Sequence, residues 1–259
     1  MRTPIYSGMG IAVIIALSIL MALPAGADTI TFNGSDGYGR SASAAFNIDI
    51  NGQLQVTLTN TSTKDALVPT DILTGVFFNI QGNPIQGLIP VSATVANGGS
   101  VLFPPSVIGA GPNVGGEWAY QAELKGAPYG ATYGISSTGL GLFGDSNFNG
   151  PELQGPPNNA LDGLQYGITS AGDNSATGNK EVTGSDALIK NSVVFLLNGA
   201  SGFSLDQISN VSFQYGTALD EPNIPGNPVP EPATMFLLGS GLVGLAGFGR
   251  KKFHKQTLS

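Results

Sequence analysis

One apolar segment near the C-terminus, residues 233–249, limits how this chain can fold more than any other part of the sequence. It holds 17 residues without a charge, and its only polar side chains are Thr234 and Ser240, so a helix formed there would have no polar face. At about 1.5 Å per residue such a helix reaches about 25 Å, which barely spans a bilayer core. We therefore predict a single transmembrane helix over residues 233–249.

The residues that follow this segment set its orientation. Arg250, Lys251 and Lys252 form a basic cluster within residues 250–255. Moving each cation to the middle of a bilayer costs about 2.5–3.5 kcal/mol, so this end is predicted to stay in the cytoplasm.

The residues that precede the segment form a proline-bracketed acidic motif, Val229-Pro230-Glu231-Pro232. The two prolines hold the backbone extended and keep Glu231 outside the helix. Together with the apolar segment and the basic end, the motif resembles the PEP-CTERM sorting tail of Gram-negative surface proteins, here over residues 229–255. The resemblance implies that exosortase, a membrane-embedded cysteine protease, recognises the tail and cuts the chain near Pro230–Pro232. The alternative is an ordinary C-terminal anchor behind a proline-rich linker.

The N-terminus carries the pattern of a secretory signal peptide. Arg2 precedes an uncharged run over residues 11–23, and Ala25-Gly26-Ala27 forms the small-residue cleavage site. We predict that residues 1–27 are a signal helix cut after Ala27. The chain then divides into an exported domain at 28–219, a proline-rich stalk at 220–228 that lifts the domain off the membrane, and the sorting tail.

The exported part lacks the side chains that most catalytic sites need. The chain has no cysteine, and its one histidine, His254, lies in the basic tail. Thiolate catalysis, histidine-ligated metals and a Ser-His-Asp triad are therefore excluded from residues 28–228. These residues carry 16 acidic and five basic side chains, a formal charge of −11 that argues against nucleic acid as a partner.

Hydrophobic periodicity predicts an all-β exported domain, a two-sheet sandwich or jelly roll. Apolar residues alternate through 42–59 (Ala45, Phe46, Ile48 and Ile50, then Leu54, Val56 and Leu58), and Asn51-Gly52 between them favours a hairpin with a type I′ turn. Residues 71–80 are almost continuously apolar, which is typical of a strand buried on both faces. Further strands are predicted near 91–95, 101–103, 118–122, 163–168, 193–197 and 211–215. Long polar loops are predicted over 104–116, 135–160 and 170–186.

One loop contains half of a calcium-binding pattern. Asp145, Asn147 and Asn149 alternate before Gly150, as in the first half of an EF-hand loop, and Glu152 could add a carboxylate. The bidentate glutamate expected later in the loop is replaced by Pro156, so Glu152, or an acid from another loop such as Asp162 or Asp173, would have to substitute. We favour a surface turn in which the aspartate caps its own backbone, with calcium as the candidate cofactor of the alternative.

Aromatic and acidic residues suggest two further hypotheses. Trp118 and Tyr120 alternate, so they could form a sugar-stacking platform, although core aromatics show the same period. Two carboxylates could serve an extracellular hydrolase, but sequence places no two of them together.

These observations favour a non-enzymatic surface or matrix protein. Its expected partners are exosortase, the membrane through one C-terminal helix before processing, and exopolysaccharide or another biofilm component. A calcium-dependent carbohydrate-binding module is the alternative.

Overall fold

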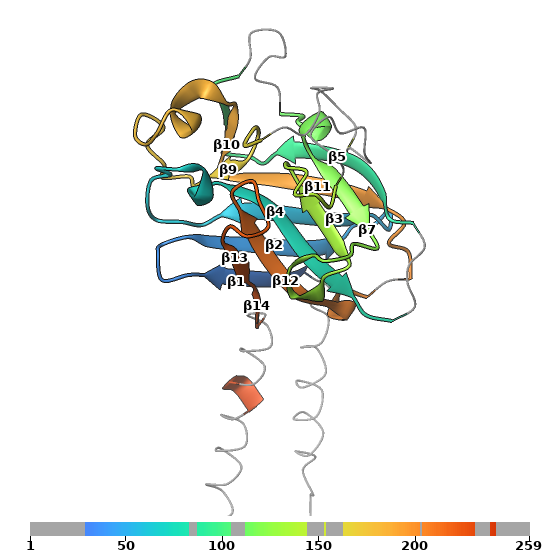
Figure 1. Cartoon of the computed structure of the whole chain (residues 1–259). Coiled ribbons are helices and arrows are strands. Elements are labelled where there is room, and N and C mark those ends of the chain that lie inside the picture. Colours follow the sequence, from blue (N-terminus) through green and yellow to red (C-terminus); the bar gives the residue numbers. More distant parts are fainter. Residues whose placement is uncertain are drawn as a thin grey trace, which may run out of the picture.

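The computed structural model describes residues 29–82, 87–104, 112–143, 153, 163–202, 204–230 and 239–241. Within these residues the chain is predominantly β and forms two sheets, which confirms the predicted all-β architecture (Figure 1). The strands are β1 (Thr29–Ser35), β2 (Ser41–Ile48), β3 (Leu54–Asn60), β4 (Leu73–Ile80), β5 (Ile89–Val95), β6 (Ser100–Leu102), β7 (Ala119–Ala122), β8 (Tyr133–Ser136), β9 (Ile168–Thr169), β10 (Leu188–Lys190), β11 (Ser192–Asn198), β12 (Ile208–Tyr215), β13 (Asn223–Pro225) and β14 (Asn227–Val229). Short helical turns are Pro69–Asp71, Gly115–Glu117, Pro128–Gly130, Glu181–Ser185 and Leu205–Gln207.

The first sheet has six antiparallel strands in the order β14-β1-β2-β3-β11-β5. The second has eight strands, with the path β13-β12-β4-β9-β10-β6 and with β8 joining β4 to β7. Strands β9 and β10 run parallel. The chain crosses repeatedly between the sheets, so neighbours in space are often distant in sequence.

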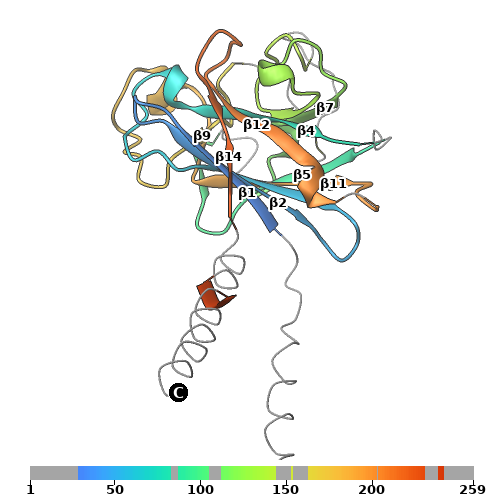
Figure 2. The same ribbon diagram turned by 90° about the horizontal axis from the view of Figure 1, so that it is seen from below.

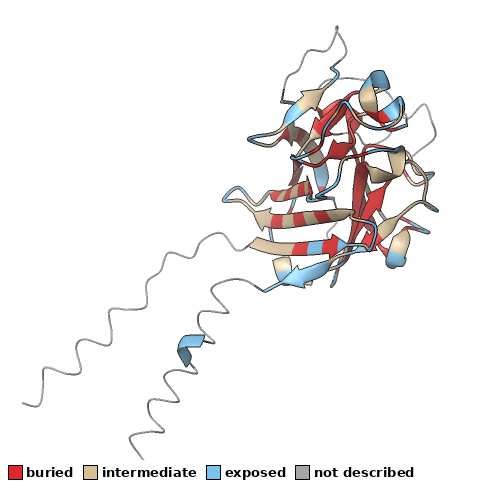
Figure 3. Ribbon diagram, turned by 90° about the vertical axis from the view of Figure 1, so that its left-hand side faces the viewer, coloured by how far each residue is buried: buried red, intermediate tan, exposed pale blue. Residues whose placement is uncertain are grey.

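The core lies between the two sheets, where one cluster of buried residues draws on strands of both (buried residues are red in Figure 3). On β2 and β3 every second residue is buried, as the alternation predicts. Phe46 of β2 meets Phe78 of β4 edge to face, with ring centroids 5.3 Å apart, which joins the two sheets. Such pairs add about 0.5–1.5 kcal/mol to the burial of their area.

Strand β4 is buried on both faces, as its continuous apolar run predicts. Phe78 points into the core between the sheets, whereas Phe77 packs on the other side against Phe143 and Leu124. Loops and short helices therefore cover the outer face of the eight-stranded sheet. The outer face of the six-stranded sheet has no comparable apolar cluster among the described residues.

The hairpin of β2 and β3 is confirmed, but its predicted type I′ turn is wrong. The loop spans Asp49 to Gln53, because Ile48 pairs with Leu54. The Asp49 carboxylate accepts the backbone N–H groups of Asn51 and Gln53, both at 2.9 Å, and the Gln53 bond is the main reason that the pKa of this carboxyl is lowered. Aspartate capping thus replaces the two-residue turn, and Ile50 is fully exposed rather than on the core face.

Two other predictions differ from the structure. The strand predicted over residues 163–168 shrinks to β9, because Gly163 and Tyr166 both adopt positive φ in a turn. The loop predicted from residue 135 begins later, since Ile135 lies inside β8. The sequence did not predict strands β1, β8, β10, β13 and β14.

Candidate functional site

The segment that leads into the Val229–Pro232 motif crosses from one sheet to the other. After β12 the chain turns through residues 216–222 and returns as β13, which pairs with β12 at Phe213 and Ile224. Gly226 then donates its N–H to Val211 at 2.7 Å, and the next three residues join the other sheet as β14. The sequence predicted a free stalk at 220–228. In the structure, β13 of this segment pairs with β12 of the eight-stranded sheet, and β14 pairs with β1 of the six-stranded sheet.

Side chains fix the turn before β13. The Glu221 carboxylate accepts the N–H groups of Thr217 and Ala218. The buried Gln214 amide donates to the carbonyl of Ala218 at 2.9 Å and accepts from the Asn223 amide at 2.9 Å. The turn is therefore held from inside the fold, and it delivers β13 and β14 to defined positions.

Strand β14 lies at the edge of the six-stranded sheet, beside β1 (Figure 2). Val229 pairs with Thr31, and Asn227 pairs with Asn33. Because the pair is antiparallel, the chain enters β1 and leaves β14 at the same end of the sheet. All three residues of β14 are exposed, and Pro228 has no N–H to donate to the ladder. The strand is thus short and held on one side only.

Gly34 lies against the segment that crosses from β13 to β14, where there is no space for a side chain. Adding a methyl group at Gly34 should therefore disturb the packing of this segment. A Cβ at Gly34 would lie 2.7 Å from the Pro225 carbonyl oxygen and 2.9 Å from the Phe213 ring. We expect Gly34→Ala to lower the free energy of unfolding by about 1–3 kcal/mol in urea titrations, as overpacking does. Gly37→Ala is the matched control, because nothing lies within 4 Å of a Cβ there. Equal stability of the two variants would contradict this account of the crossing.

Residues 228–251 match the PEP-CTERM protein-sorting motif. The tail is a PEP-CTERM sorting signal. The match confirms the resemblance seen in the sequence, and it supports export with exosortase-dependent sorting to the cell surface. No curated protein and no solved structure matches the chain.

The structure describes only the start of the PEP-CTERM motif. Val229 and Pro230 are described, and Val229 is 39% exposed at the sheet edge. Glu231, Pro232, the basic residues Arg250, Lys251 and Lys252, and the cleavage-site residues Ala25 and Ala27 lie outside the described residues. In the part of the chain that the structure does describe, no helix has the length and apolar character that crossing a bilayer requires.

The predicted calcium loop falls outside the part of the chain that the structure describes. Asp145, Asn147, Asn149 and Glu152 all lie outside the described residues, as does Asp162. Asp173, the other candidate ligand, is buried and accepts the N–H of Ala66 at 2.8 Å. Across the described ranges, no three acidic or histidine side chains gather as a metal site would require.

Trp118 and Tyr120 are core residues rather than a sugar-stacking platform. Trp118 is fully buried, with its ring centroid 4.8 Å from that of Phe195, and Tyr120 is 4% exposed. Glu117 beside them is also fully buried, which sequence alone did not suggest. Burial, with the charge of Glu117 as a smaller cause, raises the pKa of the Tyr166 phenol.

Buried phenols should make the protein sensitive to alkali. Burial raises the pKa of Tyr215 above its ordinary value of 10.0, and its hydroxyl donates to the Ser41 carbonyl at 2.9 Å. Stability from this group is fully present below pH 10 and is lost as pH rises toward the higher folded pKa, by up to about 1.4 kcal/mol per pH unit. Urea titrations between pH 9 and pH 11 should show this loss. Tyr215→Phe should flatten the slope, and an unchanged slope would contradict the assignment.

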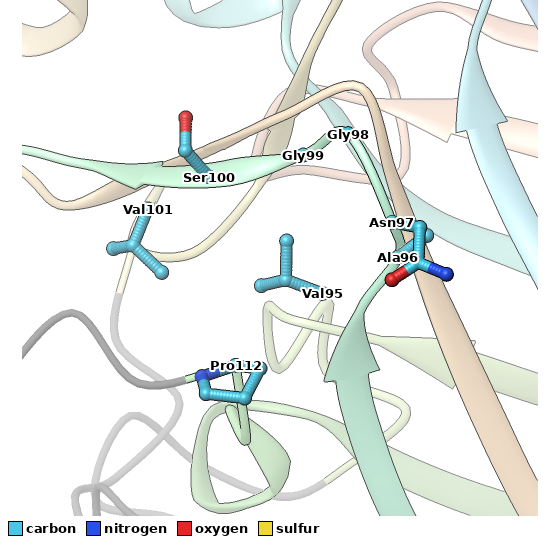
Figure 4. Close-up of a pocket in the computed structure, with 8 residues that line it drawn as sticks. All are labelled: Val95, Ala96, Asn97, Gly98, Gly99, Ser100, Val101 and Pro112. Carbon is cyan, nitrogen blue, oxygen red and sulfur yellow. The ribbon is translucent and has the colours of Figure 1, made fainter.

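A hollow of about 310 Å³ lies at the turn between β5 and β6 (Figure 4). Its lining consists of Val95, Ala96, Asn97, Gly98, Gly99, Ser100, Val101 and Pro112. None of these side chains titrates, so the hollow offers no acid, base or nucleophile.

Proposed function

We propose that this chain is an exported, exosortase-processed protein of the cell surface or extracellular matrix, with a structural or interaction role and no catalytic activity. The observation that carries the proposal is the PEP-CTERM motif placed directly behind an edge strand of the folded domain. The position of β1 also fits, because Thr29 begins two residues after the predicted signal cleavage at Ala27. Signal peptide and tail would then flank a complete two-sheet domain.

In this proposal the helix at 233–249 holds the exported domain at the membrane, and the basic residues behind it remain inside. Exosortase then cuts near Pro230–Pro232 and releases the domain or passes it to the envelope. The extracellular partner is a component of the surrounding polymer, exopolysaccharide or biofilm matrix. No described contact favours the calcium-dependent alternative; calorimetry of the full chain with millimolar calcium would reveal it as binding heat.

Processing in this proposal requires β14 to leave β1. A protease binds its substrate as an extended segment with free backbone groups, whereas Val229 is paired with Thr31. The strand is suited to detachment, since it is three residues long and exposed, and Pro228 donates no hydrogen bond. The sorting motif would thus become accessible without unfolding the rest of the domain.

Substitution of the motif acid tests the proposal. Glu231→Gln removes the charge that the proline pair holds outside the membrane, so we expect the uncut chain to accumulate in the membrane fraction. Asp220→Asn, an exposed acid near the start of the crossing segment, is the control and should be processed normally. Immunoblots of fractionated cells that express an exosortase give the readout. Normal processing of Glu231→Gln would contradict a role for this acid in recognition.

A further inference from the structure

The outer face of the six-stranded sheet is uncharged. None of the residues on β14, β1, β2, β3, β11 and β5 is acidic or basic. The side chains that alternate away from the core on the first three strands in sequence are half-buried or exposed, and nearly all carry a hydroxyl or an amide: Thr29, Thr31, Asn33, Ser35, Ser41, Ser43, Ala45, Asn47, Gln55, Thr57 and Thr59.

Strand register arranges these side chains in rows across the sheet. One row runs through Thr31, Ala45, Thr57, Val194 and Thr94. The next runs through Thr29, Asn47, Gln55, Leu196 and Ser92. Neighbours within a row are about 4.8 Å apart, so the two rows place seven polar side chains and three apolar ones (Ala45, Val194 and Leu196) side by side over five strands.

Described charges beside β1 and β2 lie beyond the ends of these strands. Arg40 pairs with Asp36 at 3.0 Å in the β1–β2 turn and reaches Asp71 at 3.4 Å. Asp49 sits at the opposite end of β2, in the β2–β3 loop. With a formal charge of −11 over residues 28–228, the surroundings of the face repel polyanions, while the face has no carboxylate to attract a polycation.

A hollow of about 530 Å³ opens on this face over β14, β1 and β2. Gly34 and Ala42 line it together with seven side chains that carry a hydroxyl or an amide. These seven are Thr31, Asn33, Ser35, Ser41, Ser43, Thr61 and Asn227. The volume is in the range of ligand sites, and each lining group can both donate and accept hydrogen bonds.

We infer that this face binds a neutral polysaccharide chain, an inference that rests on the proposed extracellular role. Sugar hydroxyls match the hydroxyl and amide groups of the rows, and the C–H surfaces of the sugar rings match Ala45, Val194 and Leu196. A second copy of the chain fits less well, because stacking two such faces brings two strongly negative molecules together. Single hydrogen bonds add only about 0.5–1.5 kcal/mol each, so binding depends on many contacts along a polymer.

Affinity electrophoresis of the full chain in detergent tests the inference. Native gels would contain dextran, hydroxyethyl cellulose or galactomannan as neutral probes, and polygalacturonate as the anionic one. We expect at least one neutral polymer to retard the chain and polygalacturonate to leave it unaffected. Retardation by none of the neutral polymers, or by polygalacturonate alone, would overturn the inference.

A matched pair of isosteric variants locates the binding. Gln55→Glu puts a charge in the middle of the face, whereas Gln121→Glu makes the same change on β7 of the other sheet. Desolvating the new charge should weaken retention by about tenfold for Gln55→Glu and by less than twofold for Gln121→Glu. If both variants weaken retention equally, the inference is overturned. It is also overturned if sedimentation shows that the protein is a dimer and that only Gln55→Glu dissociates it, because the face would then bind a second copy of the chain. Processing in cells is measured in a separate experiment. A protein that fails to bind glycans but is still cut would therefore overturn this inference and leave the proposed sorting intact.

Discussion

A chain with Thr31→Cys and Val229→Cys is expected to accumulate as the uncut precursor when the two thiols are oxidised. The residues face each other across the β1–β14 pair, where opposite Cα atoms lie about 4.5–5.5 Å apart, within the span of a disulfide. The bond would hold β14 on β1 and keep the cleavage region out of a protease cleft. Since the chain has no cysteine of its own, this would be the one disulfide that can form within it. Gel mobility of the precursor, with and without oxidant, gives the measurement.

The control for the Thr31–Val229 disulfide is a second engineered disulfide between two interior strands of the same sheet. Ala45 and Thr57 also pair directly, so Ala45→Cys with Thr57→Cys cross-links β2 to β3 and leaves β14 free. We expect that variant to be processed normally, and we expect reductant to restore processing of the locked chain. If the oxidised Thr31–Val229 pair is cut as fast as the control, detachment of β14 is not needed for processing.

Removal of the Trp118 ring should destabilise the protein far more than removal of an exposed ring. The side chain is fully buried in the core, and its ring contacts Phe195 of β11. Truncation to alanine leaves a cavity, and large-to-small changes of this kind cost about 3–5 kcal/mol. Thermal unfolding followed by circular dichroism should show the loss.

The control for the Trp118→Ala change is Tyr38→Ala, which removes an exposed ring that lies over the Arg40 guanidinium. Its cost should stay below about 1 kcal/mol. Trp118→Phe keeps most of the packing and should retain glycan binding on the opposite face of the sheet. A Trp118→Ala protein that unfolds like the wild type but loses glycan binding would instead support the sugar-stacking hypothesis.

Much of the sandwich core could be predicted because its strands obey simple periodicities. The buried faces of β2 and β3 follow strict alternation, and the continuous apolar run of β4 reflects burial on both sides. The sorting tail was recognisable because a proline-bracketed acid, an apolar run and a basic end must all occur in order.

The crossing segment could not be predicted, because its sequence resembles a linker. Pro222, Pro225 and Pro228 argue against strands, yet prolines are tolerated at a sheet edge, where the missing N–H would face solvent. The pairing partner of β14 is β1, nearly 200 residues earlier, and no local pattern links them. The uncharged outer face could not be predicted either, because it depends on the strand register, which brings together residues from five strands.

The intact mass of the protein recovered from the cell surface tests the central claim most directly. In cells that contain an exosortase, the account predicts a form that begins at Asp28, ends within the Val229–Pro232 motif, and lacks Arg250 through Lys255. In cells without the protease the basic tail should remain attached. A surface form that still carries Lys255 when exosortase is present would contradict the account.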